Sequence, residues 1–455
     1  MGLESVGGLA IKIILTKLGP TESASVACVS KGFRVWASDD SLWSIFCAND
    51  LDLSSPLDHL GNPVSSFKEA YQTWRKAFSM YPWSLVIRVK RCWDKLKDWL
   101  AINFPEALAT LRTGASEDNI KELETCLKVK LPLPTRVLYR ICDGQELTFE
   151  QYRGSLVGLI GGYSFYDHLV NVSLLPLSQV IIDTKDVIRH LGFNSRSKYI
   201  VVAASSTYNE KIFFLNCANG QLYVGTRNLT TDREMLPCVP NSLINLVHDY
   251  RGSQQQDAML LWLEEHGRRM QNSLIKVHEE GKIRSISLFP EQPPLCSTAV
   301  TNNVRVRASA VLVPEYTNLQ HEFEKFLFAY SIRISLLPEG CVINGIPFNS
   351  CQLYWRHWII RANDAVVSDV KGEAVIGKLY ALKGCYLSQP PYVPWNKAPF
   401  PTARQVPYDN FITQITWEKI IEGTPTLWSS DVVYLEREKN LRVDLKNSST
   451  TLEDD

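Results

Sequence analysis

The chain has 455 residues, about three times the length of a typical single domain, so we expect roughly two to four domains. Hydrophobic residues make up 45% and charged residues 21%, a composition that excludes wholesale disorder. The 48 basic residues balance the 48 acidic ones, so no overall field favours nucleic acid or an anionic membrane. Any binding preference must therefore come from local sequence.

The cysteines show no pattern typical of a metal or disulfide site. None of the 11 forms a Cys-x-x-Cys pair, which argues against a zinc finger or a redox dithiol. An odd number of scattered cysteines fits reduced thiols better than a secreted disulfide framework. The first residues lack the pattern of a signal peptide, and no apolar run reaches the roughly 18 residues of a membrane span. We therefore expect a soluble protein of the nucleus or the cytoplasm, with no cofactor and no metal.

About fifty residues at the start of the sequence predict a small helical unit. A first helix carries apolar residues at helical spacing and stops at Gly19-Pro20, where proline cannot continue it. Thr21 is placed to cap a second helix, Ser30 begins a third, and Asp39 precedes a fourth. A unit of this size buries too little of its surface to be stable alone. Its apolar faces therefore require a partner.

Residues 67 to 125 predict further helices, one with an aromatic face. Seven basic residues and a single acid, Asp94, lie between Arg75 and Lys97. Basic residues interleaved with aromatic ones can bind nucleic acid through phosphate contacts and stacking. The alternative is a pair of amphipathic helices with a solvated basic face, and we favour it because local charge runs are usually of this kind.

The following region predicts helices and then strands. A helix, a proline-containing turn and a second helix ending at Asp143-Gly144 come first. Residues 260 to 263 predict a closing helix, and residues 285 to 303 contain Pro and Ser without a period, which predicts a linker. Between them, apolar runs divided by Gly, Asn and Ser predict strands at 156–160, 199–204, 212–215 and 222–224.

Beyond this linker the sequence predicts an antiparallel β domain. Strand-like runs of alternating or β-branched and aromatic residues occupy 304–313, 328–337 and 353–362. The many prolines between residues 390 and 407 exclude a central strand there. The polar residues at the end of the sequence are expected to fray.

No arrangement of residues predicts an enzyme. The eight histidines form no metal-binding pair, and the sequence contains no nucleophile elbow, P-loop or kinase motif. The segment from Gly372 to Gly377 approaches a phosphate-binding glycine loop, but Ala374 stands where the middle glycine belongs. An ordinary β-turn is the competing interpretation of this segment.

Three neighbouring residues, Arg356, His357 and Trp358, form another candidate. Strand alternation places Arg356 and Trp358 on one face, where they could line an anion or peptide site. A strand with packed aromatic residues and a hydrogen-bonded His357 is the alternative. Together with Gly372 and Gly377, these three residues are the candidate ligand-binding residues of the β region.

The N-terminal unit resembles an F-box. The resemblance rests on the helix from Leu9 to Leu18, the segment from Cys28 to Trp36, and the run Asp39-Asp40-Ser41-Leu42-Trp43, with Ala10 where the family has proline. It implies docking onto a Skp-type adaptor of a cullin-containing ubiquitin ligase. The adaptor-binding residues that it implies are Leu9, Ile13, Ile14, Leu15, Leu18, Val26, Val29, Phe33 and Trp36.

Two more resemblances extend along the chain. The helix around Leu123, the turn at 131–135 and Asp143-Gly144 resemble a SUKH domain, which implies an α+β fold. The β region resembles an ApaG domain, which implies an immunoglobulin-like β-sandwich, although the family's later strands are not evident after Lys378. The order of the three parts is similar to that of plant F-box proteins described as Skp-interacting. The residues that carry the ApaG resemblance are 304–313, 330–334, 353–360 and 372–377.

These patterns and resemblances predict a multidomain α+β protein. They imply a non-catalytic substrate-recognition subunit of an SCF ubiquitin ligase, which binds the Skp-type adaptor through its F-box and a target through its distal domains, leading to ubiquitination and proteasomal degradation. The alternative is a scaffold whose ApaG-like domain binds a phosphate-containing ligand or a phosphorylated partner. The predicted parts are a helical F-box at 1–50, helices with a SUKH-like domain at 66–284, a linker at 285–303, an ApaG-like β domain at 304–400 and an unassigned segment at 401–455.

Overall fold

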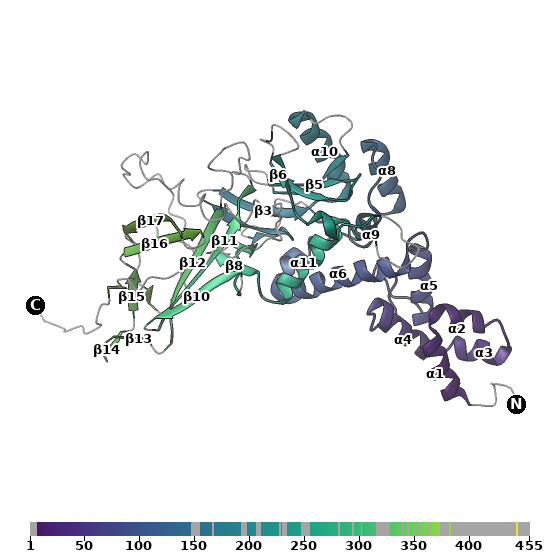
Figure 1. The fold of residues 1–455 in the computed structure, drawn as a ribbon. Coiled ribbons are helices and arrows are strands. Elements are labelled where there is room, and N and C mark those ends of the chain that lie inside the picture. The colour runs from purple at the N-terminus through teal and green to yellow at the C-terminus, as the bar shows by residue number, and fades with distance from the viewer. Residues whose placement is uncertain are drawn as a thin grey trace, which may run out of the picture.

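The chain forms an elongated arrangement of helices and sheets in a computed structural model. The N-terminal helices lie at one end, a large sheet with its helices lies in the middle, and the remaining strands lie at the other end (Figure 1). This mixture of helix and sheet agrees with the predicted fold class. The residues that the structure describes are 7–146, 155–165, 168–192, 198–205, 211–226, 229, 234–246, 255–280, 283–293, 295–301, 303–314, 328–338, 340–343, 346–348, 350–353, 355–362, 365–373, 382–383 and 443–444.

The N-terminal unit contains the helices that the sequence predicts, with one correction. Ser30 accepts a hydrogen bond from the backbone N–H of Phe33 at 3.1 Å, and Asp39 accepts one from that of Ser41 at 3.0 Å, so both side chains are N-caps. Thr21 is not a cap, because Pro20 already occupies the first helical position, where its missing N–H costs nothing. The four helices are α1 (Gly8–Leu18), α2 (Pro20–Val26), α3 (Lys31–Ala37) and α4 (Asp40–Leu51).

Two helices connect this unit to the middle of the molecule. Helix α5 (Phe67–Ala77) begins at the N-cap Ser66 and buries Tyr71 and Trp74, as its predicted aromatic face requires. Helix α6 (Trp83–Asn103) has 21 residues and therefore spans about 30 Å. Along this length α6 contacts α4 at one end and packs against α9 and α11 in the middle of the molecule.

The middle of the molecule is a large sheet covered by helices. Among the described residues it has nine strands in the order β1-β9-β2-β3-β4-β5-β6-β7, with β8 paired to β9. Strand β9 runs parallel to β1 and β2, and the pairs from β2 to β7 are antiparallel. The strands are β1 (Ser155–Leu156), β2 (Gly161–Phe165), β3 (His168–Leu174), β4 (Tyr199–Ser205), β5 (Ile212–Asn216), β6 (Leu222–Gly225), β7 (Leu236–Pro237), β8 (Lys276–Glu280) and β9 (Ile283–Ser287). The helices are α7 (Pro105–Leu108), α8 (Glu117–Leu127), α9 (Leu133–Ile141), α10 (Leu177–Leu191), the short η3 (Asn241–Leu243) and α11 (Ala258–Gln271).

Several predictions for this region are confirmed and others are wrong. Strands β4, β5 and β6 and the closing helix α11 lie where the sequence predicts them, whereas β2, β3 and α10 are not predicted by it. Of the expected strand at 156–160, only Leu156 lies in a strand, β1, where it pairs with Ser285 of β9. The linker predicted at 285–303 instead contains the end of β9 and all of β10 (Cys296–Thr301). The reason is that β9 and β10 are short and partly polar, so they lack the apolar run that predicts a strand, although each pairs with its neighbour along the chain, β8 or β11.

Gly144 follows α9 at a point where only glycine fits. Its φ is +68°, and a Cβ there would lie 2.7 Å from the backbone C and O atoms of Leu175. Gly192 has a similar φ of +62° but no atom within 4 Å of its Cβ position. We expect Gly144→Ala to lower the free energy of unfolding by more than about 3 kcal/mol and Gly192→Ala by about 1 kcal/mol, in urea titrations. Equal losses in the two variants would show that the close approach to Leu175 is unimportant.

The imidazole ring of His266, on α11, is buried. It stacks on the ring of Trp262, with centroids 4.9 Å apart, and its Nε2 atom lies 3.0 Å from the backbone oxygen of Leu159. Burial lowers the pKa of His266 to about 4, so the folded protein keeps the ring neutral. Because the unfolded chain binds this proton near pH 6.5, stability should fall as the pH drops from 6.5 to 4, by on the order of 3 kcal/mol. The His266→Gln variant should lose this part of the pH dependence of the free energy of unfolding, measured by urea titration at several pH values. The same pH dependence in the variant and the wild type would contradict this role of His266.

The remaining strands confirm the expected antiparallel β region. Strand β11 (Val304–Leu312) pairs with β10 and β12 (Phe328–Leu336), and β16 (Trp355–Ala362) pairs with β17 (Ala365–Glu373), all antiparallel. The immunoglobulin-like packing of these strands stays a prediction. The segment 401–455 lies outside the described residues except for β19. The short strands are β13 (Cys341–Ile343), β14 (Ile346–Phe348), β15 (Ser350–Leu353), β18 (Leu382–Lys383) and β19 (Val443–Asp444).

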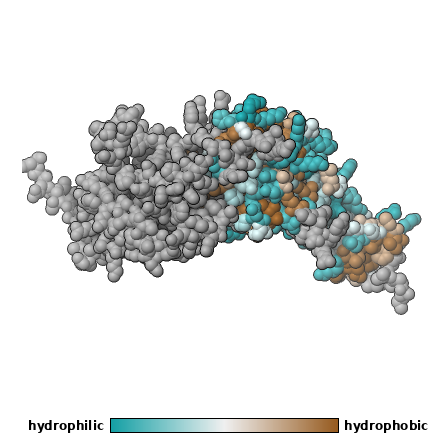
Figure 2. Space-filling view, turned by 45° about the horizontal axis from the view of Figure 1, so that its top comes forward, coloured by the Kyte–Doolittle hydropathy of each residue, from teal (hydrophilic) through white to brown (hydrophobic). Residues whose placement is uncertain are grey.

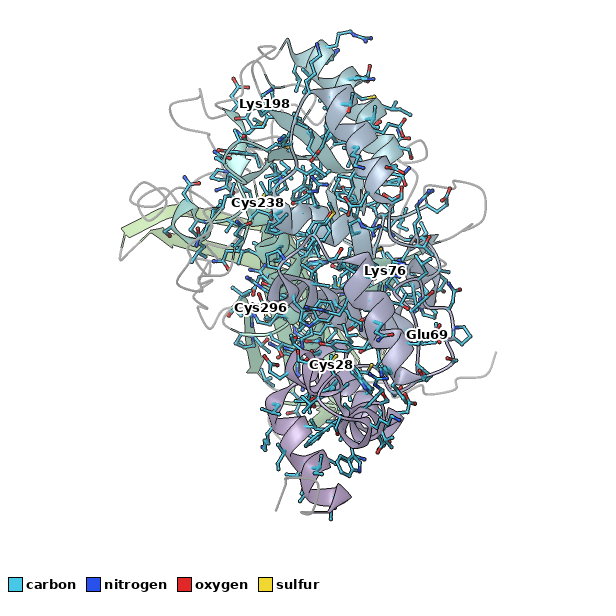
Figure 3. The ribbon with its side chains drawn as sticks, turned by 90° about the vertical axis from the view of Figure 1, so that its right-hand side faces the viewer. Cys28, Glu69, Lys76, Lys198, Cys238 and Cys296 are labelled. Carbon is cyan, nitrogen blue, oxygen red and sulfur yellow. The ribbon has the colours of Figure 1, made fainter. Side chains whose placement is uncertain are left out.

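The eight cysteines whose side chains the structure describes are all free thiols. Cys28 is exposed, whereas Cys238 and Cys296 are buried, and Figure 3 labels all three. Burial raises the pKa of Cys92 and of Cys142 to about 12, so these thiols stay protonated and act as packing groups. In the part of the chain described here, no group of three His, Cys, Asp or Glu side chains could hold a metal ion. No described helix is both long enough and apolar enough to cross a bilayer.

Candidate functional site

An apolar patch covers the outer side of the N-terminal unit. Leu9 is 77% exposed, Val29 71% and Val35 70%, values that are unusual for large apolar side chains in a folded protein. Figure 2 shows brown side chains gathered over this end of the molecule. Contiguous exposed apolar surfaces of this kind mark sites of protein interaction. The patch consists of Leu9, Ile13, Ile14, Leu18, Val29 and Val35.

Helix α1 supplies most of the patch because both of its sides are apolar. With 100° between successive residues, its four patch residues fall within one half of the helix circumference. The other half carries Ile11 and Leu15, which are buried, and α1 packs against α2, α3 and α4. Leu15 is only 1% exposed, so it is a core residue, and its predicted contact with an adaptor is corrected to a packing role.

The other predicted contact residues of this unit are less exposed than the patch. Val26, Phe33 and Trp36 are half-buried and pack against the core. The Phe33 and Trp36 rings meet edge to face, with centroids 5.6 Å apart. Because these rings are held in place by packing and are still partly exposed, they can contribute apolar contacts to a binding surface.

The N-terminal unit is joined tightly to α5 and α6. The Asp50 carboxylate at the end of α4 accepts hydrogen bonds from Tyr71 Oη at 2.6 Å and from Trp83 Nε1 at 3.3 Å. Arg91 on α6 donates to the backbone oxygen of Asn49 at 2.9 Å, and Arg75 lies over the Trp83 ring, 4.8 Å from its centroid. These contacts hold the apolar patch in a fixed orientation relative to the long helix α6.

The basic run between Arg75 and Lys97 is largely paired within the molecule. Arg88 makes a bidentate ion pair with Glu264 of α11, with distances of 2.7 and 2.6 Å. Lys90 contacts Asp94 at 2.6 Å and lies over the Trp74 ring. Since the partners are internal, the structure favours amphipathic helices over a nucleic-acid surface at these residues.

The candidate residues of the β region lie on a hairpin. Arg356, His357 and Trp358 belong to β16, and Arg356 stands directly opposite Gly372 of β17 in the antiparallel register. Gly372 is therefore paired inside a strand and does not begin a glycine loop. Gly377 lies outside the described residues. A ligand-binding function of these residues stays a prediction.

Comparison with known proteins decides the family. The chain is 59% identical over 379 residues to "F-box protein SKIP16" of Arabidopsis thaliana, which covers 83% of this chain and 86% of that protein. The chain belongs to the F-box protein family. It is also similar to "F-box only protein 3" of Homo sapiens, with 23% identity over 386 residues that cover 83% of this chain and 72% of that protein.

The C-terminal half of this F-box protein contains an ApaG domain. Residues 316–384 match the ApaG domain family, which confirms that predicted resemblance. Protein ApaG of Nitrosomonas europaea is 32% identical over 81 residues, which cover 18% of this chain and 55% of that protein. Strand β11 precedes the matched residues but pairs with β12 along its whole length, so it extends the same sheet.

The sequence did not predict one group of charged residues in this F-box protein, the cluster around Glu291. Its members come from β8, β11, β12 and the segment after β9, and they share no local motif. Only their pairing in three dimensions brings them together. Val35 of the apolar patch was also missed, although its position beside Trp36 in α3 could have indicated it.

Proposed function

We propose that this F-box protein is a non-catalytic substrate-recognition subunit of an SCF ubiquitin ligase. The observation that carries the proposal is the apolar patch on the N-terminal unit, and its position in an F-box protein supports it. In this proposal the patch binds a Skp-type adaptor, with Leu9, Val29 and Val35 as its most exposed contacts. A target protein binds to the distal domains and is ubiquitinated for proteasomal degradation.

The size of the exposed side chains suits such a contact. Burying an exposed Leu or Ile side chain contributes roughly 1.5–3 kcal/mol, so a few of these residues account for a large part of a stable association. Lys17 lies in the last turn of α1 next to Leu18, which allows a polar contact beside the apolar residues, whereas Lys12 pairs with Asp39 at 3.8 Å within the unit. The half-buried Phe33 and Trp36 extend the surface along α3.

The proposed division into domains follows the packing. Helices α1 to α4 form the F-box, and the central sheet with α8 to α11 forms the SUKH-like domain, which extends to Ser287 because β9 lies inside the sheet. The ApaG-like domain begins with β11. The contacts of Asp50 and Arg91 with α5 and α6 hold the adaptor at a set distance from these domains. The effect is to raise the local concentration of a bound target near a separate conjugating enzyme.

The test compares the proteins that co-purify with two forms of the full chain. Each form is expressed in cells and purified from their nuclear and cytoplasmic fractions. One form is the wild type and the other carries Leu9→Ser with Ile13→Ser. Deleting residues 1–50 is unsuitable because Leu42, Trp43 and Phe46 of α4 belong to the hydrophobic core. We expect the variant to lose the adaptor and the cullin but to retain target proteins. Recovery of the ligase proteins with both forms would contradict the proposal.

A further inference from the structure

A buried carboxylate joins the central sheet to the β10–β12 sheet. Glu291, in the segment after β9, accepts a hydrogen bond from His278 Nε2 at 2.6 Å and ion-paired contacts from Arg307 at 3.1 Å and Arg333. Lys276 Nζ lies 3.4 Å from the same carboxylate. Burial alone would raise the pKa of Glu291, but the hydrogen bond from His278 and the charge of Arg333 lower it to about 2. Glu291 is therefore a fixed negative charge in this cluster.

The Glu291 cluster carries more positive than negative charge. Among the described residues, the single Glu291 carboxylate forms ion pairs with three cations, Lys276, Arg307 and Arg333. Arg307 and Arg333 also stand directly opposite each other in the β11–β12 register, an arrangement that is repulsive for like charges. The Nε atom of Arg307 is buried and has no hydrogen-bond partner among the residues that the structure describes. An anion bound to this guanidinium would reduce the repulsion between the two arginines. It would also accept a hydrogen bond from the unpaired N–H donor.

The surroundings of the two arginines suit an oxyanion. The register places the pair Ser309 and Ser331 on one side of them and the pair Arg305 and Ser335 on the other. Strand alternation puts all of these residues on the same face of the sheet as Arg307 and Arg333. Hydroxyl and guanidinium donors together are the groups that bind phosphate oxygens in proteins. The side chain of Lys276 is 42% exposed, so the cluster is accessible from solvent.

A second charged network in the protein provides the contrast. Arg136 and Arg140 of α9 pair with Glu117 and Glu124 of α8, so two cations meet two carboxylates. Arg136 Nε is likewise buried without a hydrogen-bond partner among the described residues, so what distinguishes the two networks is this balance of charge. The Glu291 cluster lacks it, although it also connects separate elements.

We propose that the face of β11 and β12 around Arg307 and Arg333 binds an anion of the phosphate class, either free phosphate or a phosphorylated side chain, beside the Glu291 carboxylate. This site is separate from the candidate residues Arg356 to Trp358 and does not depend on the proposed ligase function. Glu291 limits the affinity because its charge repels the incoming anion. It also fixes the guanidinium groups in place before the anion arrives.

The test is a calorimetric titration of the full chain with inorganic phosphate and, separately, with O-phosphoserine at constant ionic strength, up to about 20 mM to cover millimolar Kd values. We expect Arg333→Gln to weaken phosphate binding about tenfold and Glu291→Gln to strengthen it several-fold. Arg268→Gln is the matched control, because Arg268 is 55% exposed on α11 and pairs only with Glu265 among the described residues. It should bind phosphate like the wild type.

The outcomes separate the possible origins of the anion. Binding of phosphate alone identifies a free anion as the ligand, and binding of O-phosphoserine at least as tightly identifies a phosphorylated side chain. Thermal unfolding of each variant without ligand shows whether it is folded, and a phosphate-dependent rise in Tm in Glu291→Gln provides a second measurement that does not depend on Arg333→Gln. No heat with wild type and Glu291→Gln, or equal binding by every variant, would overturn the proposal.

Discussion

Replacing Leu9 and Ile13 together by serine is expected to weaken binding of the Skp-type adaptor by about 100-fold or more. Both side chains are more than half exposed, at 77% and 56%, so the substitutions remove apolar contact area without opening a cavity. Each lost side chain removes roughly 1.5–3 kcal/mol of burial on binding. The measurement is the Kd of the purified full chain for the purified adaptor.

The matched control replaces two exposed isoleucines that lie away from the apolar patch. Ile102 near the end of α6 and Ile182 on α10 are 82% and 59% exposed. Ile102→Ser with Ile182→Ser changes the same amount of exposed apolar surface and should leave the Kd unchanged. Equal weakening by the two double variants would mean that the effect is not specific to the patch. Far-ultraviolet circular dichroism and Tm show that both variants are folded.

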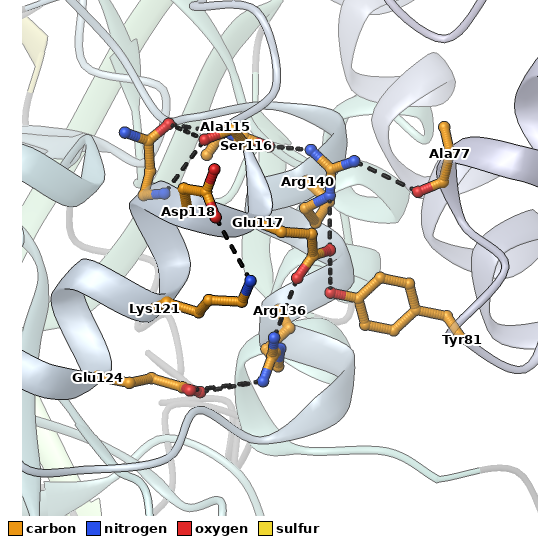
Figure 4. A network of polar contacts seen from close by, with 11 residues as sticks. Ala77, Tyr81, Ala115, Ser116, Glu117, Asp118, Lys121, Glu124, Arg136 and Arg140 are labelled. Atoms are coloured by element: carbon orange, nitrogen blue, oxygen red, sulfur yellow. Dashed lines mark hydrogen bonds and ion pairs between the residues drawn. The ribbon is translucent and has the colours of Figure 1, made fainter.

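Replacing Glu117 by alanine is expected to lower the free energy of unfolding by about 3 kcal/mol. Figure 4 shows this side chain at the centre of a polar network, where it accepts hydrogen bonds from Tyr81 Oη at 2.6 Å and Arg136 at 3.0 Å and pairs with Arg140 at 2.9 Å. Removing the carboxylate leaves two poorly exposed guanidinium groups without this partner. Urea unfolding of the full chain measures the loss.

The neighbouring residue Asp118 provides the control for this prediction. Asp118 is 92% exposed and pairs only with Lys121 among the described residues, at 3.3 Å (Figure 4). Because exposed ion pairs contribute little, Asp118→Ala should change the free energy of unfolding by less than about 0.5 kcal/mol. Equal changes in the free energy of unfolding for Glu117→Ala and Asp118→Ala would contradict a stabilising role of the Glu117 network.

The parts of the fold that depend on neighbouring residues could be predicted from the sequence. Ser30 and Asp39 begin helices because their side chains accept hydrogen bonds from backbone groups two or three residues later. The strands β4, β5 and β6 follow one another along the chain and pair as neighbours, so their apolar runs and turns were sufficient. The helical spacing of the apolar residues of α1 was likewise sufficient to predict that helix.

Contacts between distant parts of the chain could not be predicted in this way. Both sides of α1 are apolar, so the sequence did not show that Leu15 faces the core while Leu9 faces solvent. The basic run resembled a free surface because Glu264, the partner of Arg88, lies 176 residues away. The cluster around Glu291 was missed for the same reason, because Glu291 and Arg333 are 42 residues apart.

The most direct test of the proposed function is calorimetric binding of the full chain to a purified Skp-type adaptor at several temperatures. We predict saturable one-to-one binding with a negative heat-capacity change, because association buries the apolar patch. The Leu9→Ser, Ile13→Ser variant should show both a weaker Kd and a smaller heat-capacity change. Absence of binding by the wild type at about 50 μM, or binding with the same heat-capacity change in this variant, would contradict the assignment of the patch as the adaptor site.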